Sequence, residues 1–148
     1  MSLYSQYKTN TEYEKKGVTF QFGDYRIVLA RAGGANARYQ KVLTAKMKPY
    51  RRAIQNGSLD NETEIRIMRE TFIDCCIIDW LTKSVAEDGT VDWKKGIEGP
   101  DGTLKPVNKE NLLAVYEDLP DLFIEHQNLA NDMNNYRAEE IEADVGNS

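Results

Sequence analysis

The sequence predicts a mainly α protein, a small helical bundle around a central apolar helix at about 60–82, with an N-terminal β-hairpin at about 18–30. Two patterns carry this prediction. The stretch from Ile65 to Leu81 begins amphipathic and becomes apolar on every side, which is typical of a buried central helix. Alternating β-formers on both sides of the turn pair Gly23-Asp24 are typical of a hairpin. The chain of 148 residues has the length of one domain, so we expect residues 1–148 to form a single domain.

The segments around the hairpin are expected to be short and irregular. Residues 1–16 are polar, with interleaved tyrosines, and are expected to form a loose arm with one helical turn near Glu12 to Lys16. The pair Gly33-Gly34 follows the hairpin and is interpreted as a joint that needs positive φ. Asn36 is expected to cap the next helix, which Pro49 should kink or divide in two.

The second half of the chain has clear start and stop signals. Asp60 is expected to cap the central helix, and residues 85–107 form a long predicted loop rich in glycine, aspartate and proline. A loop of this length in a compact domain is usually functional or mobile. Asn108 is expected to cap a short helix, and Pro120 suits the first turn of the last one. Residues 138–148 are acidic and are expected to fray.

Composition excludes several classes of function. The net charge is −5 and the basic residues form no dense stripe, which argues against nucleic-acid binding. No apolar run approaches the roughly 20 residues that span a bilayer, so no membrane partner is expected. The adjacent Cys75 and Cys76 lie in an apolar run and are interpreted as small buried hydrophobes in a reducing compartment. These observations predict a cytoplasmic protein.

No group of residues predicts catalysis. His126, the single histidine, falls on the apolar stripe of the last helix and is interpreted as a core residue. Asp74 and Asp79 are expected on different sides of the helix, each reaching an edge of the helix or a basic partner such as an arginine. The two Asp-Gly pairs of the long loop are interpreted as turns. We therefore expect neither an enzyme nor a cofactor or metal site. The sequence predicts a protein whose work is to bind another protein.

The candidate partner contacts are arginines, aromatic residues and methionines on predicted surfaces, because such residues are enriched in interfaces. For Trp93, in the long loop, two interpretations stay open: a lid over the core or an anchor for a partner. The arginines are either contacts or members of surface ion pairs. The candidates are Arg31, Arg38, Tyr39, Met47, Tyr50, Trp93, Leu129, Met133 and Tyr136.

The order of several short motifs is more specific than any one of them. The hairpin runs into Leu-Ala-Arg-Ala-Gly at 29–33, and a helix with a proline follows. Ile-Asp-Trp-Leu at 78–81 then precedes the turn-rich loop, and Leu-Pro-Asp-Leu at 119–122 precedes the last helix. In this order and over nearly the whole chain, the sequence resembles the tail assembly chaperones of long-tailed bacteriophages.

The resemblance implies a function and two partners. Such a chaperone binds the tape measure protein in the host cytoplasm, keeps its hydrophobic helices from aggregating and helps to recruit the major tail tube protein. It leaves before the virion matures. The chain is therefore expected to be absent from the mature virion, and self-association stays open. The alternative interpretation is a virion structural or tail completion protein.

Overall fold

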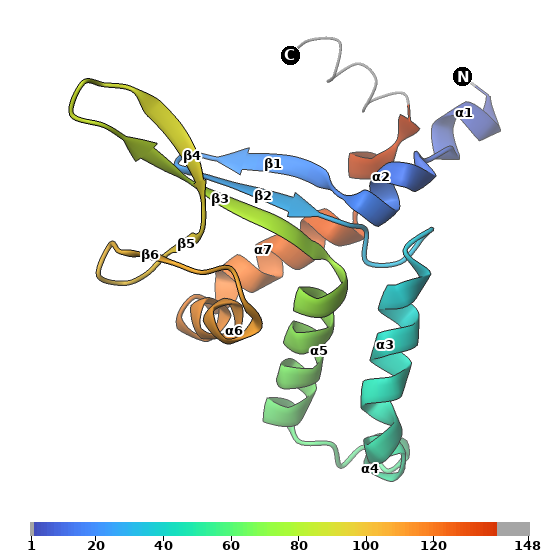
Figure 1. The fold of residues 1–148 in the computed structure, drawn as a ribbon. Coiled ribbons are helices and arrows are strands. Elements are labelled where there is room, and N and C mark those ends of the chain that lie inside the picture. Colours follow the sequence, from blue (N-terminus) through green and yellow to red (C-terminus); the bar gives the residue numbers. More distant parts are fainter. Residues whose placement is uncertain (1, 139–148) are drawn as a thin grey trace.

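The chain folds as an α+β domain, so the predicted mainly α bundle is wrong. The computed structural model describes residues 2–138; the predicted acidic tail at 138–148 lies, apart from Ala138, outside the described residues. Figure 1 shows a twisted sheet with α5, α6 and α7 on one side of it. Of these, α5 spans Asn61–Cys75, α6 Lys109–Asp118 and α7 Pro120–Asn131.

The predicted hairpin at 18–30 is confirmed and forms half of the main sheet. Strand β1 (Val18–Phe22) pairs with β2 (Tyr25–Leu29) in antiparallel register. The sheet continues through β3 (Ile77–Val85) to β4 (Val91–Lys95), in the order β1-β2-β3-β4. Because the hairpin alone is marginal, its pairing with β3 is what makes it stable.

The central helix is shorter than predicted. Helix α5 ends at Cys75, and the second half of the predicted 60–82 helix is strand β3. The side chains of β3 alternate: Ile78 is 48% exposed, whereas Trp80 is 4% exposed and packs in the core. An apolar run of this length fits a helix or a strand equally well. The free edge of β2 decides between them, because its backbone groups need a partner.

The prediction of one long loop at 85–107 is also wrong, because the segment contains three further strands. Residues 91–95 form β4, and a second, two-stranded sheet follows, built from β5 (Ile97–Glu98) and β6 (Leu104–Lys105). Both Asp-Gly pairs lie in turns, as predicted: Thr90 donates its N–H to the Asp88 side chain, and Thr103 donates its N–H to that of Asp101. The Gly and Asp signals therefore mark hairpin turns between short strands.

The remaining helices follow the predicted signals more closely. Pro49 divides the predicted helix in two, as expected, and Asp60 and Asn108 cap α5 and α6. Pro120 occupies the first turn of α7. The helical turn expected near residues 12–16 is confirmed as α2. The further helices are α1 (Leu3–Tyr7), α2 (Thr11–Lys16), α3 (Ala37–Met47), η1 (Lys48–Tyr50), α4 (Arg51–Gln55) and η2 (Met133–Tyr136).

The joint between β2 and α3 is held by two buried polar residues. Glu14 of α2 is 1% exposed, and it accepts hydrogen bonds from Thr9 at 2.6 Å and from Arg31 at 2.7 Å. Asn36 does not cap α3 as predicted; its amide donates to the carbonyls of Arg31 and Cys75. Gly34 has φ +55°, and a Cβ there would lie 1.9 Å from the Glu14 carboxylate. The predicted need for positive φ at this joint is confirmed. The hydrogen bonds of Glu14 also hold the N-terminal segment 1–16 against the joint.

The core lies between the inner face of the sheet and the helices on that side. Ile27 and Leu29 of β2 are fully buried there, and they pair with Phe20 and Val18 of β1. Aromatic rings of α5, α6 and α7 meet edge to face beneath the strands, which adds to the apolar burial. These rings belong to Phe72, Tyr116 and Phe123.

Candidate functional site

A groove of about 500 Å³ runs between α5 and α6 on the exposed side of the helical layer. Its apolar part is formed by Ile65, which is 37% exposed, and by the half-buried Leu113. Charged and polar side chains surround these two. The full lining is Glu62, Thr63, Ile65, Arg66, Arg69, Glu70, Leu113 and Glu117. An apolar strip with a charged rim between two helices is the kind of surface that accepts an amphipathic helix.

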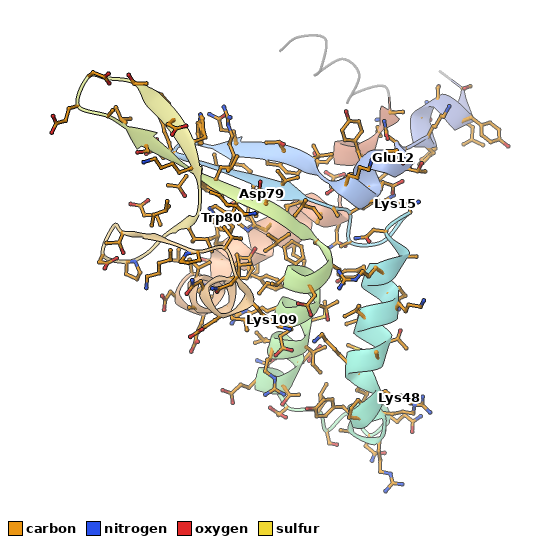
Figure 2. The ribbon with its side chains drawn as sticks, viewed as in Figure 1. Glu12, Lys15, Lys48, Asp79, Trp80 and Lys109 are labelled. Carbon is orange, nitrogen blue, oxygen red and sulfur yellow. The ribbon has the colours of Figure 1, made fainter. Side chains whose placement is uncertain are left out.

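The two helices that form the groove are fixed by caps and ion pairs. Asp60 accepts the N–H of Thr63 at 3.0 Å, and this cap places Glu62 and Thr63 in the first turn of α5. At the other end of α5, Asp74 lies 3.2 Å from Lys109 of α6 and 3.5 Å from Lys46 of α3. Figure 2 shows Lys109 beside α5. The carboxylate thus ties three helices together and holds the groove open at a set width.

Arg69 carries an unsatisfied donor at the groove. Its Nε is buried and has no hydrogen-bond partner among the described residues. Its guanidinium carbon lies 5.7 Å from the ring centroid of Phe123, within the range of a cation–π contact. A buried donor without a partner costs free energy. Arg69 therefore adds a positive charge beside that of Arg66 to the lining of the groove.

One hydrogen bond links the groove lining to the helical arm that α3, α4 and α5 form. Arg66 donates to the hydroxyl of Tyr50 at 3.3 Å, and this contact joins the groove to η1. Ile54 of α4 is 42% exposed, and Met47 is half-buried on α3. Figure 1 shows α3, α4 and α5 extending away from the sheet as one arm. The helical arm thus carries partly exposed apolar side chains outside the groove.

The structure does not bring the predicted contact residues together. Tyr39 and Tyr136 are 8% and 0% exposed and belong to the core, so their rings are unavailable to a partner. Arg31 pairs with Glu14, and Arg38, although exposed, donates to the carbonyl of Asp74. Leu129 and Met133 are half-buried on α7 and η2, and neither lines the groove. Met47 and Tyr50 lie toward the end of the helical arm away from the sheet, and neither lines the groove.

Trp93 lies on the outer face of the sheet. It belongs to β4, where it pairs with Lys83 of β3, and the guanidinium of Arg26 lies 3.9 Å from its ring centroid. The ring is therefore not a lid over the core, which lies on the opposite face. The second interpretation, an anchor for a partner, remains a prediction.

The residues considered for catalysis have structural partners. His126 is 0% exposed, with Nε2 3.0 Å from the Tyr25 hydroxyl and Nδ1 2.8 Å from that of Tyr116. Burial lowers the pKa of His126 to about 4, so the imidazole is neutral. Asp79 lies 3.8 Å from Lys95. The predicted core histidine is confirmed, and of the two alternatives for the aspartates the structure shows basic partners, which are lysines.

The two cysteines are buried free thiols, as predicted, and burial raises the pKa of both. Within residues 2–138, no group of three or more histidine, cysteine, aspartate or glutamate side chains is arranged to hold a metal ion. No helix in this part of the chain is long and apolar enough to cross a membrane.

The sequence analysis missed the groove residues Arg69, Leu113 and Glu117. One signal was present: Arg69 stands between Ile65 and Ile73 in a row spaced by four residues, so a charge interrupts an apolar stripe. The groove itself was hidden because it needs α5 and α6 side by side, and their facing residues lie more than 40 positions apart in the chain.

The fold and the groove define a class: an α+β domain with an amphipathic groove between two helices. The model of the YdaY prophage protein family matches residues 34–147, about three-quarters of the chain. The chain therefore belongs to the YdaY prophage protein family, and it is of phage origin. No curated protein and no solved structure matches it.

Proposed function

We propose that this prophage protein is a tail assembly chaperone that binds the tape measure protein in the host cytoplasm. In this role it helps to recruit the major tail tube protein and leaves before the virion matures. The order of motifs that resembles such chaperones supports the proposal, and so does membership in a prophage protein family. The observation that carries it is the amphipathic groove between α5 and α6. The role is one of binding, without catalysis or a cofactor.

The groove suits one helix of the client. A helix laid along it places apolar side chains, spaced by three or four residues, on Ile65 and Leu113. A carboxylate on the same client helix suits the positive charge that Arg66 and Arg69 give to the groove lining. The groove therefore selects an apolar helix that also carries an acidic residue.

The small size of the apolar strip suits temporary binding. Burying one aliphatic side chain contributes roughly 2 kcal/mol, so two such contacts give modest affinity once the cost of ordering is subtracted. A chaperone that leaves before the particle matures needs modest affinity, because its client must pass to the tail tube subunits. Several copies along one long client then act together.

Co-expression with the tape measure protein of the same prophage tests the proposal. The native chain is expected to keep the client in the soluble fraction and to co-purify with it. Ile65→Asp places a charge on the apolar strip, and we expect about a tenfold loss of bound client. Ile124→Asp is the matched control, because Ile124 is an exposed isoleucine of α7 outside the groove.

Two results would count against the proposal in different ways. If the native chain leaves the client insoluble, the chaperone role is wrong. If Ile65→Asp and the native chain bind the client equally, the role stands but the groove is not the site. Mass spectrometry of purified particles separates the alternative, because a structural or tail completion protein is present in the virion and a chaperone is absent.

A further inference from the structure

Strand β1 is a free edge of the main sheet. Phe22 and Tyr25 flank the two-residue turn and form a hydrogen-bonded pair, so the bonded pairs of the hairpin recur at every second residue. The backbone groups of Thr19 and Gln21 consequently point away from β2. The described part of the chain provides no backbone hydrogen bond to them. Four backbone groups thus stand open along β1.

The two edges of the sheet differ in charge. Strand β4, at the other edge, carries Asp92, Lys94 and Lys95 among its five residues. Charged side chains on an edge strand, lysines above all, discourage pairing with another chain. Strand β1 reads Val-Thr-Phe-Gln-Phe and carries no charge. One edge is therefore protected against pairing, and the other is not.

We propose that β1 pairs with β1 of a second copy of this chain, in antiparallel register about Phe20. In this register Thr19 stands opposite Gln21 of the second copy, and the open backbone groups bond to one another. Phe20 stands opposite its own counterpart at a non-bonded position, where cross-strand side chains approach most closely. The two four-stranded sheets then form one continuous sheet.

Self-complementarity singles out a second copy as the occupant. The interface is isologous, and a strand without charge meets its own copy without like-charge repulsion. Val18, Phe20 and Phe22 are each half-buried, so each retains apolar surface that pairing covers. Figure 1 places β1 well away from α5 and α6. The dimer therefore leaves the groove open, and it does not depend on the proposed function.

Sedimentation of a Thr19→Pro variant tests the inference. Proline removes the N–H of residue 19, which faces the open edge, and leaves the ladder to β2 intact. The native chain is expected to sediment as a dimer at micromolar concentration, with twice its mass of 16.9 kDa. Thr19→Pro is expected to halve that mass without changing the circular dichroism spectrum.

The control variant introduces a proline on β4, the edge strand that carries charged side chains. The N–H of Val91 also points outward, because the bonded pairs of β3 and β4 fall at the neighbouring positions. Val91→Pro is expected to leave the dimer unchanged. If Thr19→Pro fails to fold, Thr19→Lys keeps the N–H and adds an edge charge, and it is expected to weaken the dimer about tenfold. A monomeric native chain, or a dimer that withstands both Thr19 variants, would overturn the inference.

Discussion

Each of three buried polar side chains holds two parts of the chain together. Glu14 joins α2 to the joint after β2. Burial pushes the pKa of its carboxyl group up, but the hydrogen bonds from Thr9, Arg31 and the N–H of Ala35 outweigh burial, and the pKa is lowered. Asn36 joins the same loop to the end of α5, and His126 joins β2 to α6 through two tyrosine hydroxyls. At the scale of residues, these contacts determine how the elements meet.

His126 predicts how stability depends on pH. The imidazole has a pKa of about 4 in the folded chain against 6.5 for the free side chain, because burial disfavours its charged form. Between these values the unfolded chain binds the extra proton. The stability contributed by the neutral ring is therefore complete above pH 6.5 and is lost as the pH falls toward 4. The loss amounts to about 3 kcal/mol of unfolding free energy.

Urea denaturation of the native chain and of His126→Gln, at a series of pH values, measures this effect. The glutamine variant cannot titrate, so the difference in unfolding free energy between the two proteins should shrink as the pH falls from 6.5 to 4. Carboxylates titrate equally in both and cancel in the difference. Curves that run parallel across this range would contradict the assigned protonation of His126.

At the scale of elements, the sequence predicted correctly those features that depend on residues close together in the chain. The β1–β2 hairpin follows from alternation and a turn pair, and the starts of α5 and α6 follow from the caps Asp60 and Asn108. The end of α5 did not follow, because neither glycine nor proline marks Cys76 and the apolar run continues past it. Only the pairing of β3 with β2, about 50 residues earlier in the chain, makes residues 77–85 a strand.

The candidate groove could not be predicted from the sequence for a related reason. Its members from α5 were visible as an amphipathic start, but Leu113 and Glu117 belong to a separate helix. Their approach depends on the packing of Phe72 against Tyr116, which no local pattern encodes. Residues chosen as aromatic or methionine anchors were, in contrast, often core residues, because large apolar side chains fill the interior before they serve a surface.

The change from helix to strand at Cys76 predicts opposite responses at two neighbouring positions. Ile78 is 48% exposed on β3, so Ile78→Lys should change the free energy of unfolding by less than about 1 kcal/mol. Trp80 is 4% exposed and stacks on Tyr25 with ring centroids 5.2 Å apart, so Trp80→Ala should cost about 3–5 kcal/mol. If the helix continued to residue 82, the side chains of Ile78 and Trp80 would both be buried. Urea denaturation that finds Ile78→Lys as damaging as Trp80→Ala would restore the helical interpretation.

At the scale of the whole molecule, the described N- and C-terminal segments lie side by side (Figure 1). Thr9 forms an isolated antiparallel bridge with Arg137, and the N–H of Asn10 donates to the carbonyl of Tyr136 at 2.8 Å. The Tyr136 ring is fully buried, and its hydroxyl donates to the carbonyl of Leu29 at 2.9 Å. These contacts hold the C-terminal end of the described chain against β2 and against the segment that leads into α2.

These contacts predict how stability depends on where the chain ends. A chain that stops after Ala138 keeps the contacts of Tyr136 and the bridge to Thr9, so we expect it to be the more stable of two shortened chains. A chain that stops after Asn135 loses a fully buried ring and leaves the Leu29 carbonyl without its partner. We expect it to lose about 3–5 kcal/mol.

Urea denaturation of both shortened chains measures the difference, and Tyr136→Phe in the native chain divides it into two parts. The phenylalanine keeps the ring and removes only the hydroxyl, so it should cost about 1–2 kcal/mol, with the remainder due to the ring. Because Tyr136 lies against β2 and α2, far from the groove between α5 and α6, the stable chain that ends at Ala138 should bind the client as the native chain does. Equal stability of the two shortened chains would mean that Tyr136 does not close the fold.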